Sequence, residues 1–311
     1  LEVDFLYRFL LPILYKKLKI IFITIYNINK NINKNINQNI NQMDKKNVIF
    51  IDGSYFVFFR YYALISWWKL AKKDIPLPEK PFESEEFTAA FERLFIKKIK
   101  EMPKKLKIKD PIIIVGKDCP RAKIWRNEFI ESYKGNRDYS NFHGQPGFVM
   151  AYDHLFKDAG VEHIISYPTL EADDCIAIAT RHLKNTFENI KITIITADHD
   201  YMQLIEDRTD IYTLKYKPIR TKKNSTFNSE CDLFCKIITG DKSDNICGVF
   251  KKCGKVTALK LWNDKNSLEK RLDKEECRSL YERNRKIIDF KFIPKKLIDE
   301  FLKKFIEDVL N

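Results

Sequence analysis

Nine acidic residues of this chain have the types and spacing needed to bind metal ions, and they fall into five clusters. Most clusters follow an apolar, β-branched run and precede a helix-like pattern. Such residues lie at the carboxyl ends of parallel strands, where open α/β sheets place their functional sites. Carboxylates gathered there repel one another, by roughly 1 kcal/mol per pair about 4 Å apart in water, so they require bound cations. The nine residues are Asp52, Asp118, Glu171, Asp173, Asp174, Asp198, Asp200, Asp241 and Asp244.

The ligand types indicate which ions these clusters bind. Carboxylate oxygens without attendant cysteine or histidine ligands favour Mg²⁺ or Mn²⁺ over zinc. Two such ions about 4 Å apart can activate a water molecule and stabilise the leaving oxygen of a phosphodiester. No Ser/His/Asp arrangement suggests a side-chain nucleophile, and His199 is interpreted as structural. The sequence therefore predicts a site with two Mg²⁺ or Mn²⁺ ions.

Three of the acids occupy the first turn of one predicted helix. The helix macrodipole stabilises negative charge there, so a single acid would have a purely structural explanation. Glu171, Asp173 and Asp174 are three acids within four positions, which that explanation does not cover. Glu171 and Asp174 share one face by their i,i+3 spacing, and Asp173 points about 100° away from Asp174. The start of this helix can therefore serve two neighbouring ions.

The overall charge has the opposite sign to these clusters. The chain of 311 residues is 44% hydrophobic and has 56 basic and 43 acidic residues, a net charge of +13. Without the nine clustered acids, 34 acidic residues would face 56 basic ones, a net charge of +22. A protein that is basic apart from one acidic cluster favours polyanionic partners, and its acidic cluster favours bound metal. An AT-rich gene would explain the abundance of lysine, but it would not explain the grouping of the acids.

The cysteines favour a reducing compartment. Their number, seven, is odd, no CxxC pair occurs, and Cys231 and Cys235 lack nearby histidines that would complete a zinc site. Free thiols are therefore expected. Together with the absence of targeting signals, they favour an intracellular, cytoplasmic protein, in the cytoplasm of a host if the chain is viral.

The first 42 residues differ from the remainder. They contain two apolar bursts, 9–15 and 20–26, each shorter than the ~20 residues that span a bilayer, and then the repeat NINKNINKNINQNINQ. We interpret residues 1–42 as a disordered or spurious leader and Met43 as the true start. The alternative is a targeting or membrane leader.

The elements that must position the acids alternate along residues 43–227. Strands are predicted at 48–51, 112–115, 162–166, 192–196 and 211–214, the last as an edge strand. Helices are predicted at 54–64, 86–100, 121–142, 147–159, 170–184 and near 199–205. Such alternation predicts an α/β fold, a mostly parallel, Rossmann-like sheet flanked by helices. Residues 228–311 are predicted to form a smaller helical subdomain.

Five acidic segments occur in a characteristic order. They are VIFIDGS with Asp52, IIIVGKDC with Asp118, EADD at 171–174, DHD at 198–200 and GDKSDNI at 240–246. Two further segments, WR at 125–126 and YKGNR at 133–137, follow the one with Asp118. Over residues 47–262 the chain thereby resembles the flap endonuclease and 5′ exonuclease family, especially its phage, bacterial and viral members. Any one segment would be weak support, but five in order are specific. The resemblance implies a PIN-like nuclease domain.

The resemblance also implies roles for the acids. Asp52, Asp118, Glu171 and Asp173 would hold the first metal ion. Asp174, Asp198, Asp200 and Asp244 would hold or support the second ion, with Asp241 alongside.

Basic residues are expected to contact the nucleic acid. By resemblance, residues 119–147 form an arch or gateway over the site, in which Lys134 and Arg137 steer the scissile phosphate and Arg121 and Arg126 contribute charge. The aromatic residues Trp125, Phe129 and Tyr133 repeat every four positions, which favours a helix core over base stacking. For Tyr55, stacking on a terminal base and a core position both remain open.

Residues 239–262 are similar to the family's helix–three-turn–helix, a form of helix–hairpin–helix. The glycines Gly248 and Gly254 would let backbone N–H groups approach duplex phosphates, and Lys251, Lys252 and Lys255 would add charge. The loop lacks a glycine that is usual in the family and is one residue longer. The monovalent-ion site common in the family is therefore not predicted here.

These features predict a structure-specific 5′ nuclease that hydrolyses DNA by two-metal-ion catalysis in replication, repair or recombination. Its expected partner is branched or nicked DNA with a 5′ end, with an RNA–DNA hybrid as a further candidate, and it is expected to act as a monomer without a membrane. One alternative is an inactive DNA-binding scaffold, which a cleavage assay would distinguish from the nuclease. The other is a related-fold ribonuclease, which a comparison of RNA with flap DNA would distinguish. The sequence does not distinguish exonuclease from endonuclease activity.

Overall fold

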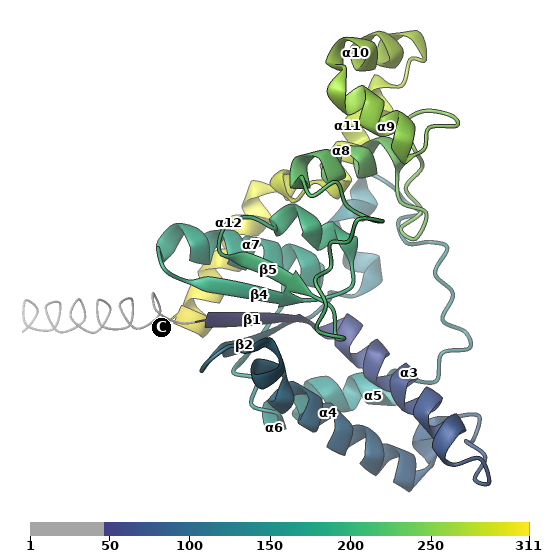
Figure 1. The fold of residues 1–311 in the computed structure, drawn as a ribbon, viewed down its shortest axis with the longest axis vertical. Coiled ribbons are helices and arrows are strands. Elements are labelled where there is room, and N and C mark those ends of the chain that lie inside the picture. The colour runs from purple at the N-terminus through teal and green to yellow at the C-terminus, as the bar shows by residue number, and fades with distance from the viewer. Residues whose placement is uncertain (1–46, 311) are drawn as a thin grey trace, which may run out of the picture.

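The computed structural model describes residues 47–310, which fold around a five-stranded parallel sheet (Figure 1). The strands are β1 (Asn47–Asp52), β2 (Ile112–Gly116), β3 (His163–Ile165), β4 (Lys191–Ile195) and β5 (Thr209–Tyr212). Their order across the sheet is β3-β2-β1-β4-β5, and every neighbouring pair is parallel. The α/β class is thereby confirmed, and β5 lies at an edge as expected. The predicted leader, residues 1–42, lies outside the described residues.

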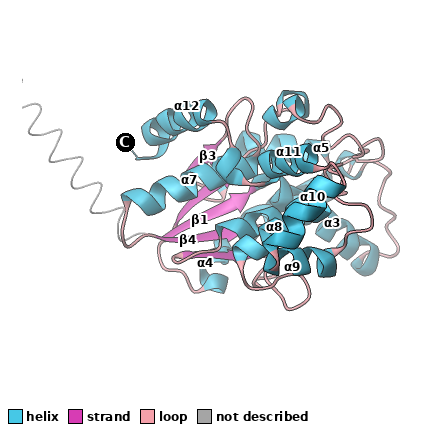
Figure 2. Cartoon of the chain, turned by 90° about the horizontal axis from the view of Figure 1, so that it is seen from above, coloured by secondary structure: helices cyan, strands magenta, loops and turns pink. Residues whose placement is uncertain are grey.

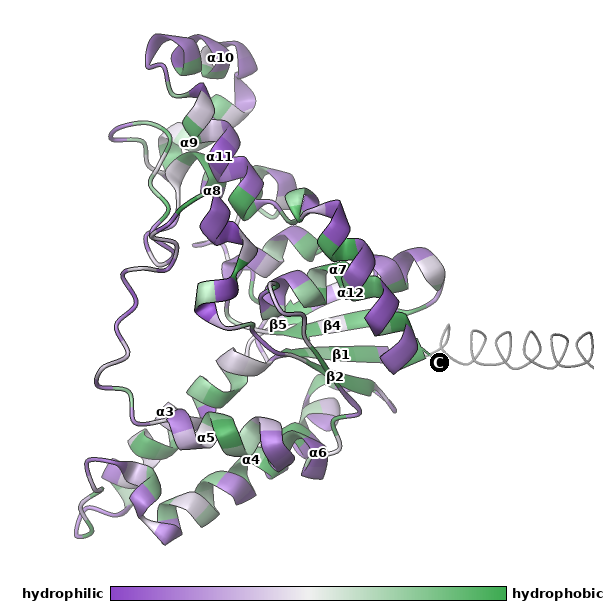
Figure 3. Ribbon diagram, turned by 180° about the vertical axis from the view of Figure 1, so that it is seen from behind, coloured by the Kyte–Doolittle hydropathy of each residue, from purple (hydrophilic) through white to green (hydrophobic). Residues whose placement is uncertain are grey.

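Helices cover both faces of the sheet (Figures 1 and 2). Along β1, Val48 and Phe50 point into the core that α7 and α12 close, while Ile49 and Ile51 point into the core beneath α3 and α4. This alternation is the period-two pattern of a strand buried on both faces, and it explains why β1 is continuously apolar. Figure 3 shows the hydrophobic strands at the centre and hydrophilic residues along α10.

The helices extend beyond the predicted bounds in several places. They are α3 (Gly53–Ala71), α4 (Glu85–Leu106), α5 (Gln145–Met150), α6 (Phe156–Asp158), α7 (Ala172–Thr186), α8 (Ser229–Thr239), α9 (Lys255–Asn263), α10 (Lys265–Lys274), α11 (Arg278–Ile288) and α12 (Lys295–Phe305). Shorter 3-10 or π segments are η2 (Pro81–Glu83), η3 (Arg121–Lys123), η4 (Trp125–Glu128), η5 (Ala151–Leu155), η6 (His199–Leu204), η7 (Phe290–Phe292) and η8 (Ile306–Leu310). Helix α3 continues past residue 64 because Trp68 is buried against the same core.

The helix predicted at 121–142 is not formed. Only η3 and η4 are helical there, and Lys134 adopts the left-handed conformation, with φ of 55°. The side chains of Trp125 and Tyr133 donate hydrogen bonds to carboxylates of the acidic cluster. Contacts with that cluster, rather than helical periodicity, therefore determine the path of this segment. The four-residue aromatic repeat does not form a helix face.

The C-terminal helices divide into two groups. Helices α8 to α11 form a projecting lobe with its own small core, which includes Phe234, Val249 and Leu272 (Figure 1). Helix α12 instead returns to the sheet, where Phe301 and Phe305 join the core under α7. The helices beyond residue 228 therefore contribute to two separate cores. Within residues 47–310, no helix combines the length and apolar character that a membrane crossing requires.

Candidate metal centre

The acids gather at the carboxyl edge of the sheet because three neighbouring strands end there. Asp52 is the last residue of β1, Asp118 follows β2, and Asp198 follows β4. Asp52 caps helix α3 by accepting a hydrogen bond from the Tyr55 N–H at 3.1 Å. A Cβ atom at Gly53 would lie 2.6 Å from the Gly116 carbonyl oxygen, so only glycine lets α3 begin directly after this carboxylate.

Burial and mutual repulsion affect the protonation of this group. Burial raises the pKa of Asp52 to about 7, and the charges of Asp118 and Asp198 add to the shift. The Tyr55 N–H and the Thr196 hydroxyl, which donates to Asp52 at 3.1 Å, act in the opposite direction. A cation bound beside Asp52 would lower its pKa and favour the ionised carboxylate at neutral pH.

Helix α7 adds the second set of acids. Its first turn forms a capping box, in which the Asp174 carboxylate accepts from the Glu171 N–H and the Glu171 side chain accepts from the Asp174 N–H. Carboxylate oxygens of Glu171, Asp173 and Asp174 lie within 4.8 Å of one another. Burial, followed by the charges of Asp174 and Glu171, raises the pKa of Asp173 well above its usual value. Asp118 joins this set through Oδ1, which accepts from the Ala172 N–H at 2.8 Å.

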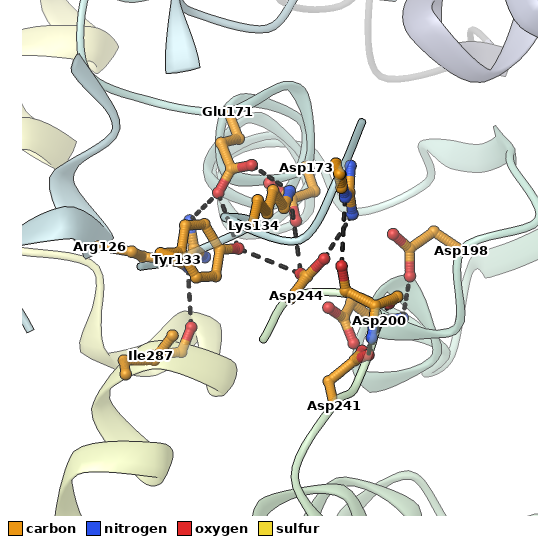
Figure 4. A network of polar contacts seen from close by, with 12 residues as sticks. Arg126, Tyr133, Lys134, Glu171, Asp173, Asp198, Asp200, Asp241, Asp244 and Ile287 are labelled. Atoms are coloured by element: carbon orange, nitrogen blue, oxygen red, sulfur yellow. Dashed lines mark hydrogen bonds and ion pairs between the residues drawn. The ribbon is translucent and has the colours of Figure 1, made fainter. Parts of the chain in front are cut away.

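The third set connects the sheet to the helical lobe (Figure 4). Oxygens of Asp200, in η6, and of Asp241 and Asp244, in the turn between α8 and α9, lie within 4.8 Å of one another. Gly240, with φ of 72°, lets the chain reverse before Asp241, where a Cβ atom would lie 2.4 Å from the Ile246 carbonyl oxygen. A cavity of about 560 Å³ opens beside this set and reaches Lys255.

Six of the nine acids form two close sets, and the assignment of each acid to an ion stays a prediction. Asp174 lies with Glu171 and Asp173, not with Asp200 and Asp244. The reason is local, because Asp174 shares a helix turn with Asp173 and its side chain turns back into the capping box.

Four cationic side chains enter the cluster: Lys134, Arg137, Lys236 and Arg126. Lys134 pairs with Glu171 and, at 3.8 Å, with Asp244, and Arg137 pairs with Asp244. Burial alone would lower the pKa of Lys134, but the charges of Glu171 and Asp244 raise it above its ordinary value. Lys134 and Arg137 therefore lie beside the carboxylates, and their role in steering a phosphate stays a prediction.

The third cation, Lys236, was not identified from the sequence. Its ammonium lies 2.8 Å from Asp241 and also pairs with Asp200. Burial would raise the pKa of Asp241, but the Lys236 charge and the Ser243 hydroxyl hold it at about 2. One sequence signal could have identified Lys236. It is a lysine in the last turn of a helix, where positive charge is stabilised, and an acid follows about one turn later.

Tyr133 connects the acid sets. Its hydroxyl lies 3.1 Å from Glu171 Oε2 and 3.2 Å from Asp244 Oδ2. The arch segment (residues 119–147) is also fixed by its backbone, because the Lys134 N–H donates to the Asp244 carbonyl oxygen at 3.0 Å. At its other end the Tyr139 ring stacks on Phe58. The arch segment thus connects the helical lobe with α3 (Figure 1).

The structure corrects the expectation that Arg126 contacts nucleic acid from the surface. Its side chain is only 2% exposed, and its guanidinium donates to Glu171, Asp174 and the Ile287 carbonyl oxygen. Arg121, by contrast, is exposed. Tyr55 is half-buried, and its hydroxyl accepts from the Leu214 N–H at 3.2 Å.

The turn between α8 and α9 presents Lys251, Lys252 and Lys255 at the surface. No atom lies within 4 Å of a Cβ built at Gly254, so its backbone is open to a ligand. A Cβ at Gly248 would instead lie 2.9 Å from the Thr239 carbonyl oxygen. Gly248 therefore allows close packing of this turn against α8, and its proposed contact with a duplex phosphate stays a prediction.

The residues of the centre fit divalent cations. All the candidate ligands are carboxylate oxygens, which suit hard cations. The fully buried Tyr201 hydroxyl has no hydrogen-bond partner among the described residues, although the charges of Asp52, Asp173 and Asp118 all act on it. A buried orphan hydroxyl beside several carboxylates indicates a site that needs further polar or ionic groups to be complete.

Comparisons with known proteins give a consistent result. A family model described as "5′-3′ exonuclease, N-terminal resolvase-like domain" matches residues 47–232. A 5′-3′ exonuclease of Buchnera aphidicola is 31% identical over 250 residues, which cover 78% of this chain and 79% of that protein. A 5′-3′ exonuclease of Bacillus subtilis is 32% identical over 164 residues, which cover 49% of this chain and 52% of that protein. The chain therefore spans only about half the length of this second relative.

Solved structures share the fold. The 5′-exonuclease of bacteriophage T5 with bound zinc aligns with a TM-score of 0.60 and 16% identity, covering 85% of this chain and 99% of that one. A T5 flap endonuclease in a complex with DNA and metal ions aligns with a TM-score of 0.57 and 17% identity, covering 84% of this chain and 98% of that one.

Proposed function

This chain belongs to the 5′-3′ exonuclease family, and we propose that it is a divalent-metal-dependent 5′ nuclease that hydrolyses DNA at flaps, nicks or ends. The observation that carries the proposal is the acidic centre itself. Carboxylates from three strand ends, one helix start and the α8–α9 turn converge on it, with Lys134 and Arg137 among them.

Two Mg²⁺ or Mn²⁺ ions are proposed to bind in this centre. Glu171 and Asp173, with Asp52 and Asp118, form one half, and Asp200, Asp241 and Asp244, with Asp198, form the other. When bound, such a pair of ions activates the attacking water and stabilises the leaving oxygen of the phosphodiester. The carboxylates supply the hard oxygen ligands, and their crowding gives the centre its affinity for cations.

Lys134 and Arg137 are proposed to orient the scissile phosphate. Both are cations whose side chains already reach the carboxylates that would surround the ions. The guanidinium of Arg137 has the fork geometry that matches a phosphate, and the Lys134 ammonium adds a point charge. Their position at the base of the arch segment would place a phosphate directly over both halves of the centre.

The α8–α9 turn is proposed to hold the duplex part of the substrate. Gly254 leaves its backbone open, and Lys251, Lys252 and Lys255 surround it with positive charge. Such contacts go to phosphates and read the shape of the nucleic acid, not its sequence. The proposed substrate is therefore branched or nicked DNA with a 5′ end, bound by a monomer.

A cleavage experiment tests this proposal. The full chain is incubated with a 5′-flap DNA labelled at both ends, in Mg²⁺, in Mn²⁺ and in EDTA. We expect cleavage near the base of the flap with either ion and none in EDTA. The Asp173→Asn variant should not cleave in Mg²⁺, but it should still bind the flap. Tight binding without cleavage in either ion would support the inactive scaffold instead.

A ribonuclease remains the second candidate, because one relative, 27% identical over 207 residues, is the "Ribonuclease H" of bacteriophage T4. The same experiment therefore includes an RNA–DNA hybrid and single-stranded RNA. Faster cleavage of either than of the DNA flap would favour this candidate.

A further inference from the structure

Arg126 and Asp174 form a buried ion pair inside the metal centre. Their side chains are 2% and 0% exposed. The guanidinium grips the carboxylate with two parallel hydrogen bonds of 2.7 Å, from Nη2 to Oδ1 and from Nη1 to Oδ2. Such bidentate pairs combine charge with fixed geometry. The pair is buried in the protein and lies among candidate metal ligands. It therefore engages one carboxylate that an ion could otherwise bind.

Four donors surround the Asp174 carboxylate, and the side chain is fully buried. Its Oδ2 atom also accepts from Trp125 Nε1 at 2.9 Å and from the Glu171 N–H at 3.2 Å. Oδ2 thus accepts from three donors, and Oδ1 accepts from Arg126 Nη2 within the enclosed pair. A metal ion that took the place of Arg126 would leave the buried guanidinium with Glu171 alone as its counter-ion.

Asp173, the next residue along the chain, is in a different situation. Its carboxylate accepts a hydrogen bond from the Asp174 N–H at 2.7 Å, and no ion pair holds it. It is partly exposed, whereas Asp174 is not. Two adjacent acids on the same helix turn are therefore in opposite states, one enclosed and neutralised, the other open.

We infer that Asp174 is not a ligand of either metal ion, and that Arg126 and Asp174 act together as a fixed brace that positions the ligands around them. This inference rests on the proposed two-metal nuclease function. Arg126 is a positioning residue in it, since it would touch neither substrate nor metal.

The brace connects three parts of the molecule. Arg126 belongs to the arch segment, Asp174 to α7, and the Ile287 carbonyl oxygen, which accepts from Arg126 Nε at 2.8 Å, to the end of α11. Its Nη1 atom also donates to Glu171 Oε2 at 2.9 Å. That bond fixes the Glu171 carboxylate so that Oε1 faces Lys134 and the interior of the centre. The brace thus sets the orientation of a metal ligand without being one.

The inference is tested by measuring metal binding directly. Mn²⁺ bound to the full chain is counted by electron paramagnetic resonance for the wild type and for Asp173→Asn and Asp174→Asn, which are adjacent and isosteric. We expect Asp174→Asn to bind as many Mn²⁺ ions as the wild type, and Asp173→Asn to lose one ion or at least tenfold in affinity. Loss of an ion in Asp174→Asn, equal to that in Asp173→Asn, would overturn the inference.

A second measurement remains informative if Asp174→Asn is poorly folded. The double variant Arg126→Gln/Asp174→Asn removes both charges and should recover a higher unfolding midpoint than Asp174→Asn alone, because no buried charge is left unpaired. A double variant that is no more stable than Asp174→Asn would contradict a brace. Neither readout requires cleavage, so a chain that binds Mn²⁺ but cuts no flap DNA would refute the proposed function without affecting this comparison.

Cleavage kinetics give a third readout that a general loss of stability would not produce. A higher metal concentration can restore the activity of a variant with weakened metal affinity. It cannot restore the activity of a variant whose metal ligand is misplaced. We therefore expect high Mn²⁺ to restore part of the activity of Asp173→Asn but none of the activity lost in Asp174→Asn, with kcat lowered and KM for the flap retained. Recovery of Asp174→Asn by Mn²⁺ would identify it as a ligand.

Discussion

Lys236 occupies the half of the centre formed by Asp200, Asp241 and Asp244. It pairs with two of these three acids, so it neutralises part of the charge that a metal ion would neutralise. A lysine is a flexible point charge on a long stem, and its side chain here remains 19% exposed. Unlike Arg126, it can leave without unfolding its surroundings. The two halves of the centre therefore differ at single residues. A metal ion could displace Lys236 from its half, whereas Arg126 is fixed in the other half.

If Lys236 competes with metal, removing its charge strengthens metal binding. We expect Lys236→Met to raise the Mn²⁺ affinity of the full chain about tenfold, which corresponds to ~1.4 kcal/mol. This is below the roughly 4 kcal/mol that Coulomb's law gives for a pair at 4 Å and an effective dielectric constant of 20. A Mn²⁺ titration measures it, with the exposed Lys260→Met as the matched control. Unchanged or weaker binding would mean that Lys236 holds the acids in place for the ion.

The sequence predicted the acids of the centre better than its cations. Carboxylates such as Asp52 and Asp198 directly follow apolar strands, and the carboxyl ends of neighbouring parallel strands meet at one edge. No comparable rule predicts the position of Lys236 or the burial of Arg126. Both depend on how the helical lobe docks onto the sheet. Charge in the sequence therefore indicated that cations were near, but not which of them were buried.

At the scale of elements, the turn between α8 and α9 contains two glycines that serve different purposes. Gly248 allows close contact with the Thr239 carbonyl oxygen, whereas Gly254 has open space around it, at the start of α9. The first supports the packing of the turn, and the second leaves its backbone accessible. The same residue type thus contributes to stability at one position and to proposed duplex binding at the other.

Alanine substitutions separate these purposes. We expect Gly248→Ala to lower the free energy of unfolding by about 1–3 kcal/mol, the usual cost of overpacking, as measured by urea denaturation. Gly254→Ala should leave that free energy nearly unchanged and weaken binding of nicked duplex DNA, as measured by fluorescence anisotropy. Each variant is the control for the other. Equal loss of stability in both would show that the turn has no open face.

The elements themselves were predicted unequally. The five strands were found because buried, β-branched runs such as Ile112–Gly116 have few alternatives. The arch segment was wrongly predicted as a helix because Trp125, Phe129 and Tyr133 have helical spacing. The Trp125 indole N–H and the Tyr133 hydroxyl instead donate to carboxylates far away in the sequence, and such tertiary contacts override a local periodic pattern.

At the scale of the whole molecule, the acidic centre lies where the sheet and the helical lobe meet. Asp52, Asp118 and Asp198 come from the strand ends, and Asp241 and Asp244 come from the turn that leaves α8. With no metal bound, Asp118 and Asp198 repel the buried Asp52 and oppose the compact state, whereas the acids of the turn are paired with cations. A metal ion bound by the same residues would offset this repulsion and join the strand ends to the turn. Divalent ions should therefore stabilise the entire fold, in addition to any role in cleavage.

The pH dependence of unfolding tests this view, and its sign follows from Asp52. Burial, with the charges of Asp118 and Asp198, raises its pKa from 3.8 to about 7 in the native state. Between these values the native chain binds more protons than the unfolded chain, so the free energy of unfolding falls as pH rises, and the full penalty is present above about pH 7. One unit of pKa difference is worth about 1.4 kcal/mol, and each kcal/mol moves the midpoint by roughly 2–4 °C in a chain of this size class.

In EDTA we therefore expect the full chain to unfold at a higher temperature at pH 6 than at pH 8. Saturating Mg²⁺ should raise the midpoint at pH 8 and reduce or reverse the difference, because metal binds the ionised carboxylates. Asp52→Asn should flatten the EDTA profile and exceed the wild type in stability at pH 8, since it carries no charge to bury. Differential scanning fluorimetry measures all four conditions. An EDTA profile that Asp52→Asn leaves unchanged would show that repulsion at Asp52 does not limit the stability of the metal-free molecule, and that the sheet and the lobe hold together without help from the centre.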